Sequence, residues 1–223
     1  MRNDYISCRY SFIYLWEMNY QSFYQQFRSR VIVSLDEIRK YEVGFLKLNI
    51  INRIKKWYIR PIVKWWYIFG DVHVHEDILY YIANKIYEPS YVSLEMALSY
   101  YHLIPEGVFT VTSISSKKTQ HFNTIFGKFI YRSIKENLMF GYTLKKIGNL
   151  TYKIADIEKA VLDFFYFKPY LNMGKDFEDL RFDCHEFLEQ ADIKRFNKYL
   201  KQYPSLKFQK QMTDFISYVQ RNA

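Results

Sequence analysis

The most informative stretch of the sequence is Tyr58-Ile-Arg-Pro-Ile-Val-Lys-Trp-Trp-Tyr-Ile-Phe69, which is followed by Gly70 and Asp71. The stretch is rich in β-branched and aromatic residues, which favour extended backbone, and the glycine–aspartate pair is typical of a strand end. Pro61 has no backbone N–H to donate within a central strand, so it belongs on an edge or at the turn. The stretch therefore predicts a β-hairpin.

Three helical patterns precede the hairpin. Apolar and aromatic side chains at helical spacings predict a helix over residues 11–27. Ser34-Leu-Asp-Glu37 is a capping box, in which the serine caps the third amide and the glutamate reaches back, and it predicts a short helix to Tyr41. After a turn at Gly44, a third helix is predicted by an apolar stripe, formed by Leu46, Ile50, Ile51 and Ile54. This order of elements predicts a winged helix-turn-helix, whose second helix of the pair enters the DNA major groove.

Positive charge gathers in two parts of the chain. The formal net charge is +9. Between Glu42 and Asp71 there are six basic residues and no acidic residue, and residues 107–153 contain eight basic residues against Glu136 alone. Such clusters attract polyanions, nucleic acid foremost. A solvated basic face is the alternative interpretation of each cluster.

The predicted DNA-binding residues lie in the first cluster. Arginine reads guanine and asparagine reads adenine in the major groove. We expect that groove to be faced by Lys47, Asn49, Asn52, Arg53 and Lys56. Phosphate contacts are expected from Lys55, Arg60 and Lys64, and a second basic surface from Lys117, Lys118, Lys128 and Arg132. An Arg53→Ala substitution is then expected to relax the preference for one base.

The rest of the chain predicts a mixed α/β domain. We expect a boundary near Tyr87 to Pro89, with an N-terminal winged helix over residues 1–88 and a second domain over residues 89–223. Strands are predicted over 108–114 and 127–133, with a polar loop between them, and in a hairpin over 140–155. Helices are predicted over 75–86, 93–102, from 156 to 169, 176–190, 192–202 and 205–220. The expected fold class is therefore α+β, with a helical segment at the end.

Several segments of the second part resemble the AbiEi family of type IV antitoxins. These segments are Tyr91-Val-Ser-Leu-Glu-Met-Ala-Leu-Ser-Tyr-Tyr-His-Leu-Ile-Pro-Glu106, Phe109-Thr-Val-Thr-Ser113, Phe126-Gly-Lys-Phe-Ile-Tyr-Arg132, Phe140-Gly-Tyr142 and Ile154-Ala-Asp-Ile-Glu-Lys-Ala-Val-Leu-Asp-Phe-Phe-Tyr166. They occur in the family's order and together cover about residues 89–168. Trp65 is a departure, because the family's wing usually has glycine at this point.

The resemblance implies a bacterial antitoxin of an abortive-infection, phage-defence system. Family members bind inverted repeats in their own promoter as transcriptional repressors. Their second domain counteracts a nucleotidyltransferase toxin, in many members without a stable complex. The implied partners are therefore double-stranded promoter DNA and a cognate toxin, and the chain itself is not expected to be an enzyme.

Three acidic residues offer an alternative function. Asp156, Glu158 and Asp163 could bind a metal ion in an enzyme that acts on nucleic acid, chiefly through Asp156 and Glu158. Asp156 at a helix N-cap and Glu158 in the first turn also fit a purely structural role, because the helix dipole favours anions there. A third possibility is a protein-interaction module whose basic faces meet an acidic partner.

Neither a metal nor a cofactor is expected. His73-Val-His75-Glu76 could contribute metal ligands, but surface histidines beside a helix start explain it more simply. The two cysteines, Cys8 and Cys184, exclude a disulfide framework and favour a reducing compartment. The first ten residues lack a signal-peptide pattern, and no apolar stretch approaches the roughly 18–20 residues that span a bilayer. We therefore expect a cytoplasmic protein without a membrane partner.

Overall fold

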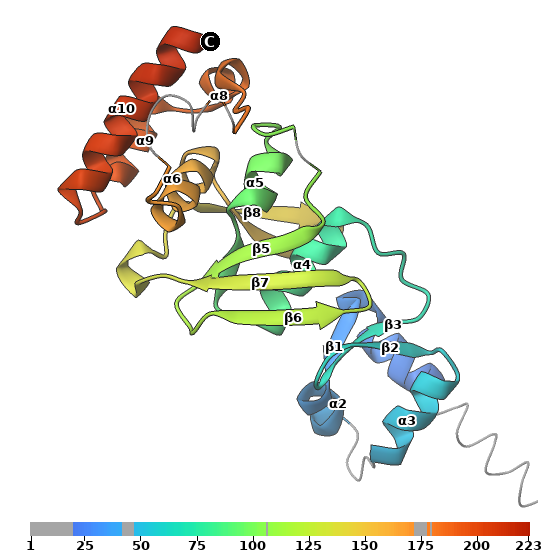
Figure 1. Ribbon diagram of the computed structural model, residues 1–223. Coiled ribbons are helices and arrows are strands. Elements are labelled where there is room, and N and C mark those ends of the chain that lie inside the picture. Colours follow the sequence, from blue (N-terminus) through green and yellow to red (C-terminus); the bar gives the residue numbers. More distant parts are fainter. Residues whose placement is uncertain (1–19, 42–46, 106, 172–177, 179) are drawn as a thin grey trace, which may run out of the picture. The chain divides into compact units, whose positions relative to one another are not determined.

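The chain forms two compact units, Met1–His73 and Val74–Ala223. The structure is a computed structural model that describes residues 20–41, 47–105, 107–171, 178 and 180–223 (Figure 1). The boundary therefore lies earlier than the expected position at residues 87–89. The reason is α4 (Glu76–Ile86), which packs against strands β4, β5 and β9 of the second unit, whose bounds are given below. Of the elements expected from the sequence, residues 11–19, Gly44, Leu46 and the helix start at 176 lie outside the described residues.

The first unit combines short helices with a three-stranded antiparallel sheet. Residues 20–27 are helical. The elements that follow are η1 (Arg28–Arg30), β1 (Ile32–Ser34), α2 (Leu35–Tyr41), α3 (Lys47–Lys55), β2 (Ile59–Val63) and β3 (Trp66–Phe69). The strand order is β1-β3-β2. The predicted hairpin is confirmed, and Pro61 lies on β2, which is an edge strand of this sheet as far as the structure describes the chain.

The capping box begins α2 as the sequence predicts. The Glu37 N–H donates to Ser34 Oγ over 3.2 Å, and the Ser34 N–H donates to Glu37 Oε2 over 2.9 Å. Two backbone donors at the helix start are thereby satisfied. The short strand β1 immediately before the helix was not expected, and its residues pair with β3.

The core of the first unit is aliphatic and aromatic. Its buried members come from the helix at residues 20–27, from α2 and α3 and from all three strands, and they are Phe23, Phe27, Val33, Leu35, Ile38, Ile50, Ile59, Tyr67 and Phe69. Gly70, directly after β3, lies against the backbone before β2, and a Cβ atom there would overlap the carbonyl oxygen of Trp57.

The second unit is built on a mixed six-stranded sheet, so the α+β fold class is confirmed. Its strands are β4 (Ser90–Val92), β5 (Thr110–Ser115), β6 (Gln120–Thr124), β7 (Gly127–Ser133), β8 (Tyr142–Ile147) and β9 (Leu150–Ala155). Their order is β6-β7-β5-β4-β9-β8. β5 is parallel to β7 and β4 is parallel to β9, whereas the other pairs are antiparallel. Strand β6 replaces part of the expected polar loop.

Helices cover both faces of this sheet (Figure 1). On one face, α4 is held by Tyr131 Oη, which donates to the Ala83 carbonyl over 2.7 Å, and by Tyr152 Oη, which donates to Asp77 over 2.8 Å. On the other face lie α5 (Glu95–Tyr100) and α6 (Ile157–Phe167), whose Asp163 accepts a hydrogen bond from Tyr91 Oη over 2.9 Å. Successive strand residues point to opposite faces, so each strand contributes to both layers.

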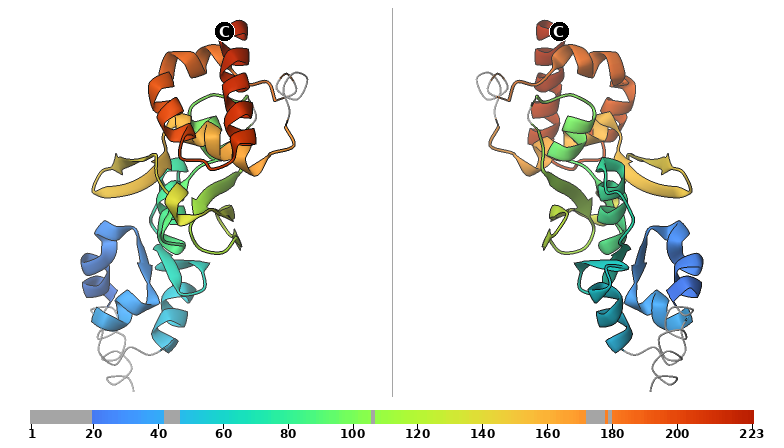
Figure 2. Two further views of the ribbon diagram at one scale, coloured as in Figure 1. Left: turned by 90° about the vertical axis from the view of Figure 1, so that its left-hand side faces the viewer. Right: turned by 90° about the vertical axis from the view of Figure 1, so that its right-hand side faces the viewer.

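The C-terminal helices pack together beside α6, as Figure 2 shows. They are α8 (Cys184–Gln190), α9 (Ile193–Leu200) and α10 (Leu206–Asn222). Aromatic contacts join them, with Phe215 of α10 at 4.8 Å from Phe165 and at 6.2 Å from Phe187, measured between ring centres. The later part of the helix predicted over 176–190 is α8, at whose N-cap Asp183 accepts a hydrogen bond from the Glu186 N–H.

Candidate nucleic-acid interface

Helix α3 buries one face and exposes a stripe on the other. Ile50 is buried against the core of the first unit, whereas Leu48 is 60 % and Ile51 39 % exposed. Because helix neighbours lie three and four residues apart, Leu48, Ile51, Asn52 and Lys55 follow one another along a single face. Lys55 is exposed and Asn52 half-buried. The sequence placed Ile51 on the buried stripe, and that placement is wrong.

Arg53 is not available to read a base. Its side chain is only 2 % exposed, and its guanidinium lies 4.0 Å from the centre of the Phe23 ring. The prediction that Arg53 faces the major groove is therefore wrong. The long apolar stem of an arginine can occupy a core position, and its planar head is attracted by an aromatic face.

An aromatic layer continues from this arginine. The Tyr20 and Tyr58 rings are stacked with their centres 3.8 Å apart. Burial, assisted by the Asp71 carboxylate, raises the pKa of Tyr20 to about 12, so this ring stays neutral at alkaline pH values at which an exposed tyrosine already ionises. The face of α3 that carries Arg53 is thus packed inside the first unit.

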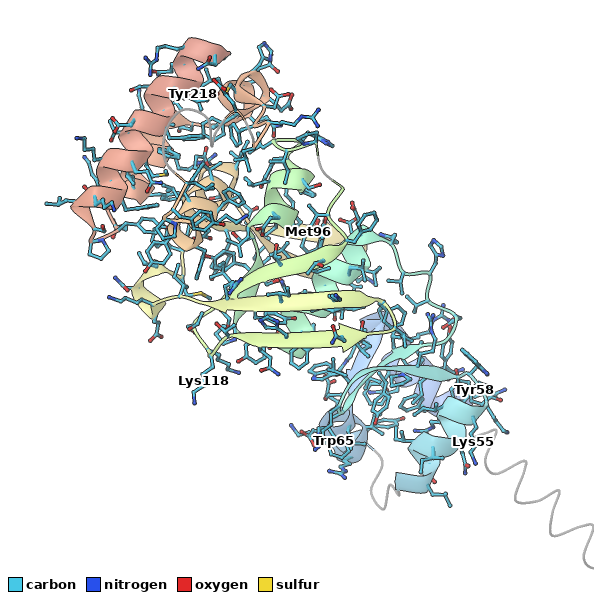
Figure 3. The ribbon with its side chains drawn as sticks, in the orientation of Figure 1. Lys55, Tyr58, Trp65, Met96, Lys118 and Tyr218 are labelled. Atoms are coloured by element: carbon cyan, nitrogen blue, oxygen red, sulfur yellow. The ribbon has the colours of Figure 1, made fainter. Side chains whose placement is uncertain are left out.

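The hairpin turn presents an exposed lysine and tryptophan. Lys64 Nζ lies 5.0 Å from the centre of the Trp65 ring, and Trp65 is 46 % exposed. The φ angle of Trp65 is +72°, which is the left-handed region that favours glycine. Trp65 and Lys55 are labelled in Figure 3, on the turn and at the end of α3.

The other residues of the first unit that were predicted to contact DNA differ in how far their side chains are exposed. Arg60 is half-buried and donates to the Val72 carbonyl over 2.9 Å, so its guanidinium is committed to its own unit rather than free for a phosphate. Lys56 is exposed, with its Nζ 5.7 Å from the Tyr58 ring centre, and Asn49 is half-buried. The Lys47 side chain lies outside the described part of the chain.

The four residues of the predicted second basic surface lie in two separate groups. All four predicted residues are exposed. Lys128 and Arg132 share the face of β7 that points away from α4, because the intervening Phe129 and Tyr131 are buried on the α4 side. Lys117 instead approaches Tyr87, with Nζ 5.6 Å from the ring centre. Lys118, labelled in Figure 3, belongs to the same loop.

The acidic residues of α6 form internal contacts. Asp163 is fully buried and accepts hydrogen bonds from the Tyr91, Ser93 and Tyr203 hydroxyls over 2.9, 2.9 and 3.1 Å, and from Lys159 Nζ. Burial lowers the pKa of Lys159, whereas the Asp163 carboxylate opposes this shift. This buried network ties α6 to β4 and to Tyr203, in the turn between α9 and α10.

Asp156 and Glu158 are directed to α9. Asp156 stands at the N-cap of α6, yet its carboxylate accepts from Tyr199 Oη over 2.8 Å rather than from a helix N–H. Glu158, which is fully buried, accepts from Arg195 over 2.9 Å. These carboxylates therefore serve structural contacts. Within the described ranges, no group of three or more histidine, cysteine, aspartate or glutamate side chains is arranged to hold a metal ion.

Comparison with known proteins found no family model that matches the chain and no curated protein that matches it. Among the helices that the structure describes, none is both long enough and apolar enough to cross a membrane.

Proposed function

We propose that this chain is the antitoxin of a type IV toxin–antitoxin system, which binds its own promoter DNA through the first unit and represses its operon. The observation that carries the DNA-binding part is the exposed stripe of α3, in a segment with six basic residues and no acid. The order of helix, strand, two helices and hairpin supports a winged helix, in which the second helix of the pair enters the major groove.

The proposed groove contacts differ from those expected from the sequence alone. Leu48, Ile51, Asn52 and Lys55 form the face that meets the bases, and Arg53 is excluded by its burial. An asparagine amide pairs with adenine through two hydrogen bonds, and apolar side chains contact the thymine methyl group. Lys56 and Lys64 are close enough to this face in sequence and exposed enough to neutralise phosphates, with Trp65 on the wing.

The antitoxin part of the proposal rests on the resemblance to the AbiEi family. Two of the segments that carry the resemblance contain Tyr91 and Asp163, and their side chains are hydrogen-bonded in the buried network of α6. The first and the last of the resembling segments are thus joined in one core. By the same resemblance, the second unit counteracts a nucleotidyltransferase toxin.

A titration of the full chain with its own upstream DNA and a scrambled duplex, at several salt concentrations, tests the DNA-binding part. We expect preference for the native duplex and a steep fall of affinity with salt, because phosphate contacts release counterions. Lys56→Gln, which removes a proposed phosphate contact, should weaken binding to both duplexes, whereas Asn52→Ala should cost about 1–3 kcal/mol on the native duplex only. Lys207→Gln, which removes an exposed charge of α10 outside both basic clusters, is the control. Equal, weak binding of both duplexes would overturn the proposal.

Deoxyuridine in place of single thymines tests the apolar part of the stripe. Deoxyuridine lacks only the methyl group, so at least one position should weaken binding of the parent protein. The same replacement should have no effect on the Leu48→Ala, Ile51→Ala double variant, because the partner of the methyl group is already gone. Equal effects in both proteins would exclude these side chains as the methyl contacts.

Co-expression with the adjacent toxin gene in a bacterial host tests the antitoxin part separately. The full chain should restore growth, and Asn52→Ala should restore growth as well while failing to repress a promoter–reporter fusion. Failure of the parent chain to restore growth would contradict the antitoxin role and leave the DNA-binding result untouched.

A further inference from the structure

A pocket of about 410 Å³ opens on the second unit, at the face of the sheet that carries α5 and α6. Its volume falls within the roughly 300–1,000 Å³ typical of small-molecule sites. The lining residues come from the start of α5, from β5 and β7, and from the end of α6. They include Glu95, Thr110, Ile130, Arg132, Phe167 and Lys168.

The charged groups of the pocket include one cation that is not neutralised locally. Lys168 Nζ forms an ion pair with Glu95 over 2.8 Å and lies 4.1 Å from the centre of the Phe164 ring. Arg132 is exposed, and its guanidinium has no hydrogen-bond or ion-pair partner in the described part of the chain. Lys128, which is not part of the lining, stands four residues earlier on the same face of β7 and adds positive charge to that face of the strand.

The part of the pocket between these charged groups is aliphatic and aromatic, so it suits a flat ring. Phe167 and Tyr170 contribute aromatic surface, and Ile130 lies between Lys128 and Arg132 on β7. Aromatic side chains stack on planar bases. The Lys168–Glu95 pair adds a donor and an acceptor, which is the combination that the edge of a nucleobase requires. The Thr110 hydroxyl adds a further polar group to the lining.

We infer that this pocket binds a free mononucleotide. The guanidinium of Arg132 takes the phosphate, because a planar fork of N–H donors matches the oxygens of that group. The base occupies the aromatic and aliphatic part of the pocket, with its edge at Lys168 and Glu95. Inorganic phosphate would leave this apolar part unused, and a nucleoside would leave Arg132 without its anion. The site is separate from the proposed DNA-binding residues, all of which belong to the first unit.

Isothermal titration of the full chain with AMP, GMP, CMP and UMP tests this inference. At least one of them should bind saturably with one site per chain. The corresponding nucleoside should bind about ten-fold more weakly, because a charge-assisted hydrogen bond is lost. Arg132→Gln should weaken the nucleotide to a similar extent and leave the nucleoside unchanged. Because Arg132 is exposed, this variant is expected to fold, and its circular dichroism spectrum verifies that.

Matched variants separate the pocket from general attraction of anions. Arg221→Gln removes an exposed arginine of α10, and Lys55→Gln removes a proposed DNA contact, so both should bind the nucleotide as the parent does. The inference is overturned if no mononucleotide binds below about 1 mM. It is also overturned if Arg132→Gln has no effect, if Arg221→Gln has the same effect, or if only a single-stranded oligonucleotide binds. Loss of DNA binding in Lys55→Gln with normal nucleotide binding would bear on the proposed repressor role alone.

Discussion

At the scale of single residues, Arg53 is expected to determine stability rather than base preference. Its side chain fills space beneath α3 and contacts the Phe23 ring. Arg53→Ala should therefore lower the free energy of unfolding by roughly 2–4 kcal/mol, through lost packing and the lost cation–π contact. Chemical denaturation followed by circular dichroism measures this change.

Lys55→Ala is the matched control for Arg53→Ala, since an exposed lysine on the same helix should change stability by less than about 0.5 kcal/mol. The folded fraction of Arg53→Ala should retain the parent's preference among DNA duplexes. Unchanged stability together with relaxed base preference would instead show that Arg53 contacts a base in the major groove.

The buried pair Lys159 and Asp163 gives a second prediction. Asp163→Asn leaves the Lys159 ammonium buried without a counter-charge, so the second unit should lose about 3–5 kcal/mol of stability. The double variant Lys159→Met, Asp163→Asn removes both charges and should be less destabilised than the single variant. Thermal unfolding of the three proteins checks this order, and an equally unstable double variant would show that the charge is not the cause.

The burial of these charged residues could not be predicted from the sequence. The α6 block was expected to have a buried apolar face, yet Lys159, Glu158 and Asp163 are fully buried as well. Their partners, such as Tyr91 and Arg195, lie far away in sequence, so no local pattern indicates them. In α3, the sequence predicted a buried Ile51 and an exposed Arg53, and the structure shows the reverse. Arg53 can be buried because an arginine stem can replace an aliphatic side chain in a core.

At the scale of elements, the sequence predicted correctly those features that depend on interactions between neighbouring residues. The capping box of α2 and the turn at Gly148, whose φ is +53°, depend on residues close in sequence. Strand β6 (Gln-His-Phe-Asn-Thr) has little apolar alternation, because it is an edge strand and only Phe122 and Thr124 are partly buried. The three-residue strands β1 and β4 are too short to give a period at all.

The hairpin turn of the first unit gives a prediction at this scale. Trp65 has a left-handed backbone conformation, which is unfavourable for residues with a Cβ atom. Trp65→Gly should therefore raise the free energy of unfolding by about 0.5–1 kcal/mol, because relief of this strain outweighs the greater freedom of glycine in the unfolded chain. Thermal or chemical denaturation of the variant measures the change.

Trp66→Gly, one residue later, is the control for the turn. Trp66 belongs to strand β3 and pairs with Ser34 and Val63, so glycine there should destabilise the unit by about 1 kcal/mol. If both substitutions lower stability equally, strain at Trp65 is not significant. A gain in stability with a loss of DNA affinity for Trp65→Gly would indicate that the ring contacts DNA.

At the scale of the whole molecule, the position of the boundary can be tested with two fragments. Residues 74–223 retain α4, whereas residues 89–223 lack it and expose Tyr131 and Tyr152, which are at most 2 % exposed in the folded unit. We expect residues 74–223 to unfold cooperatively in calorimetry and residues 89–223 to show no such transition. A cooperative transition of the shorter fragment would restore the later boundary.

The division into two units also separates the chain optically. All four tryptophans, Trp16, Trp57, Trp65 and Trp66, belong to residues 1–73. Emission excited at the red edge of indole absorption therefore originates entirely in the first unit, and Trp57, which is 75 % exposed, is accessible to a collisional quencher. The second unit has only tyrosine and phenylalanine as intrinsic chromophores, so the tryptophan emission of an unlabelled full-length sample reports on the unfolding of the first unit alone.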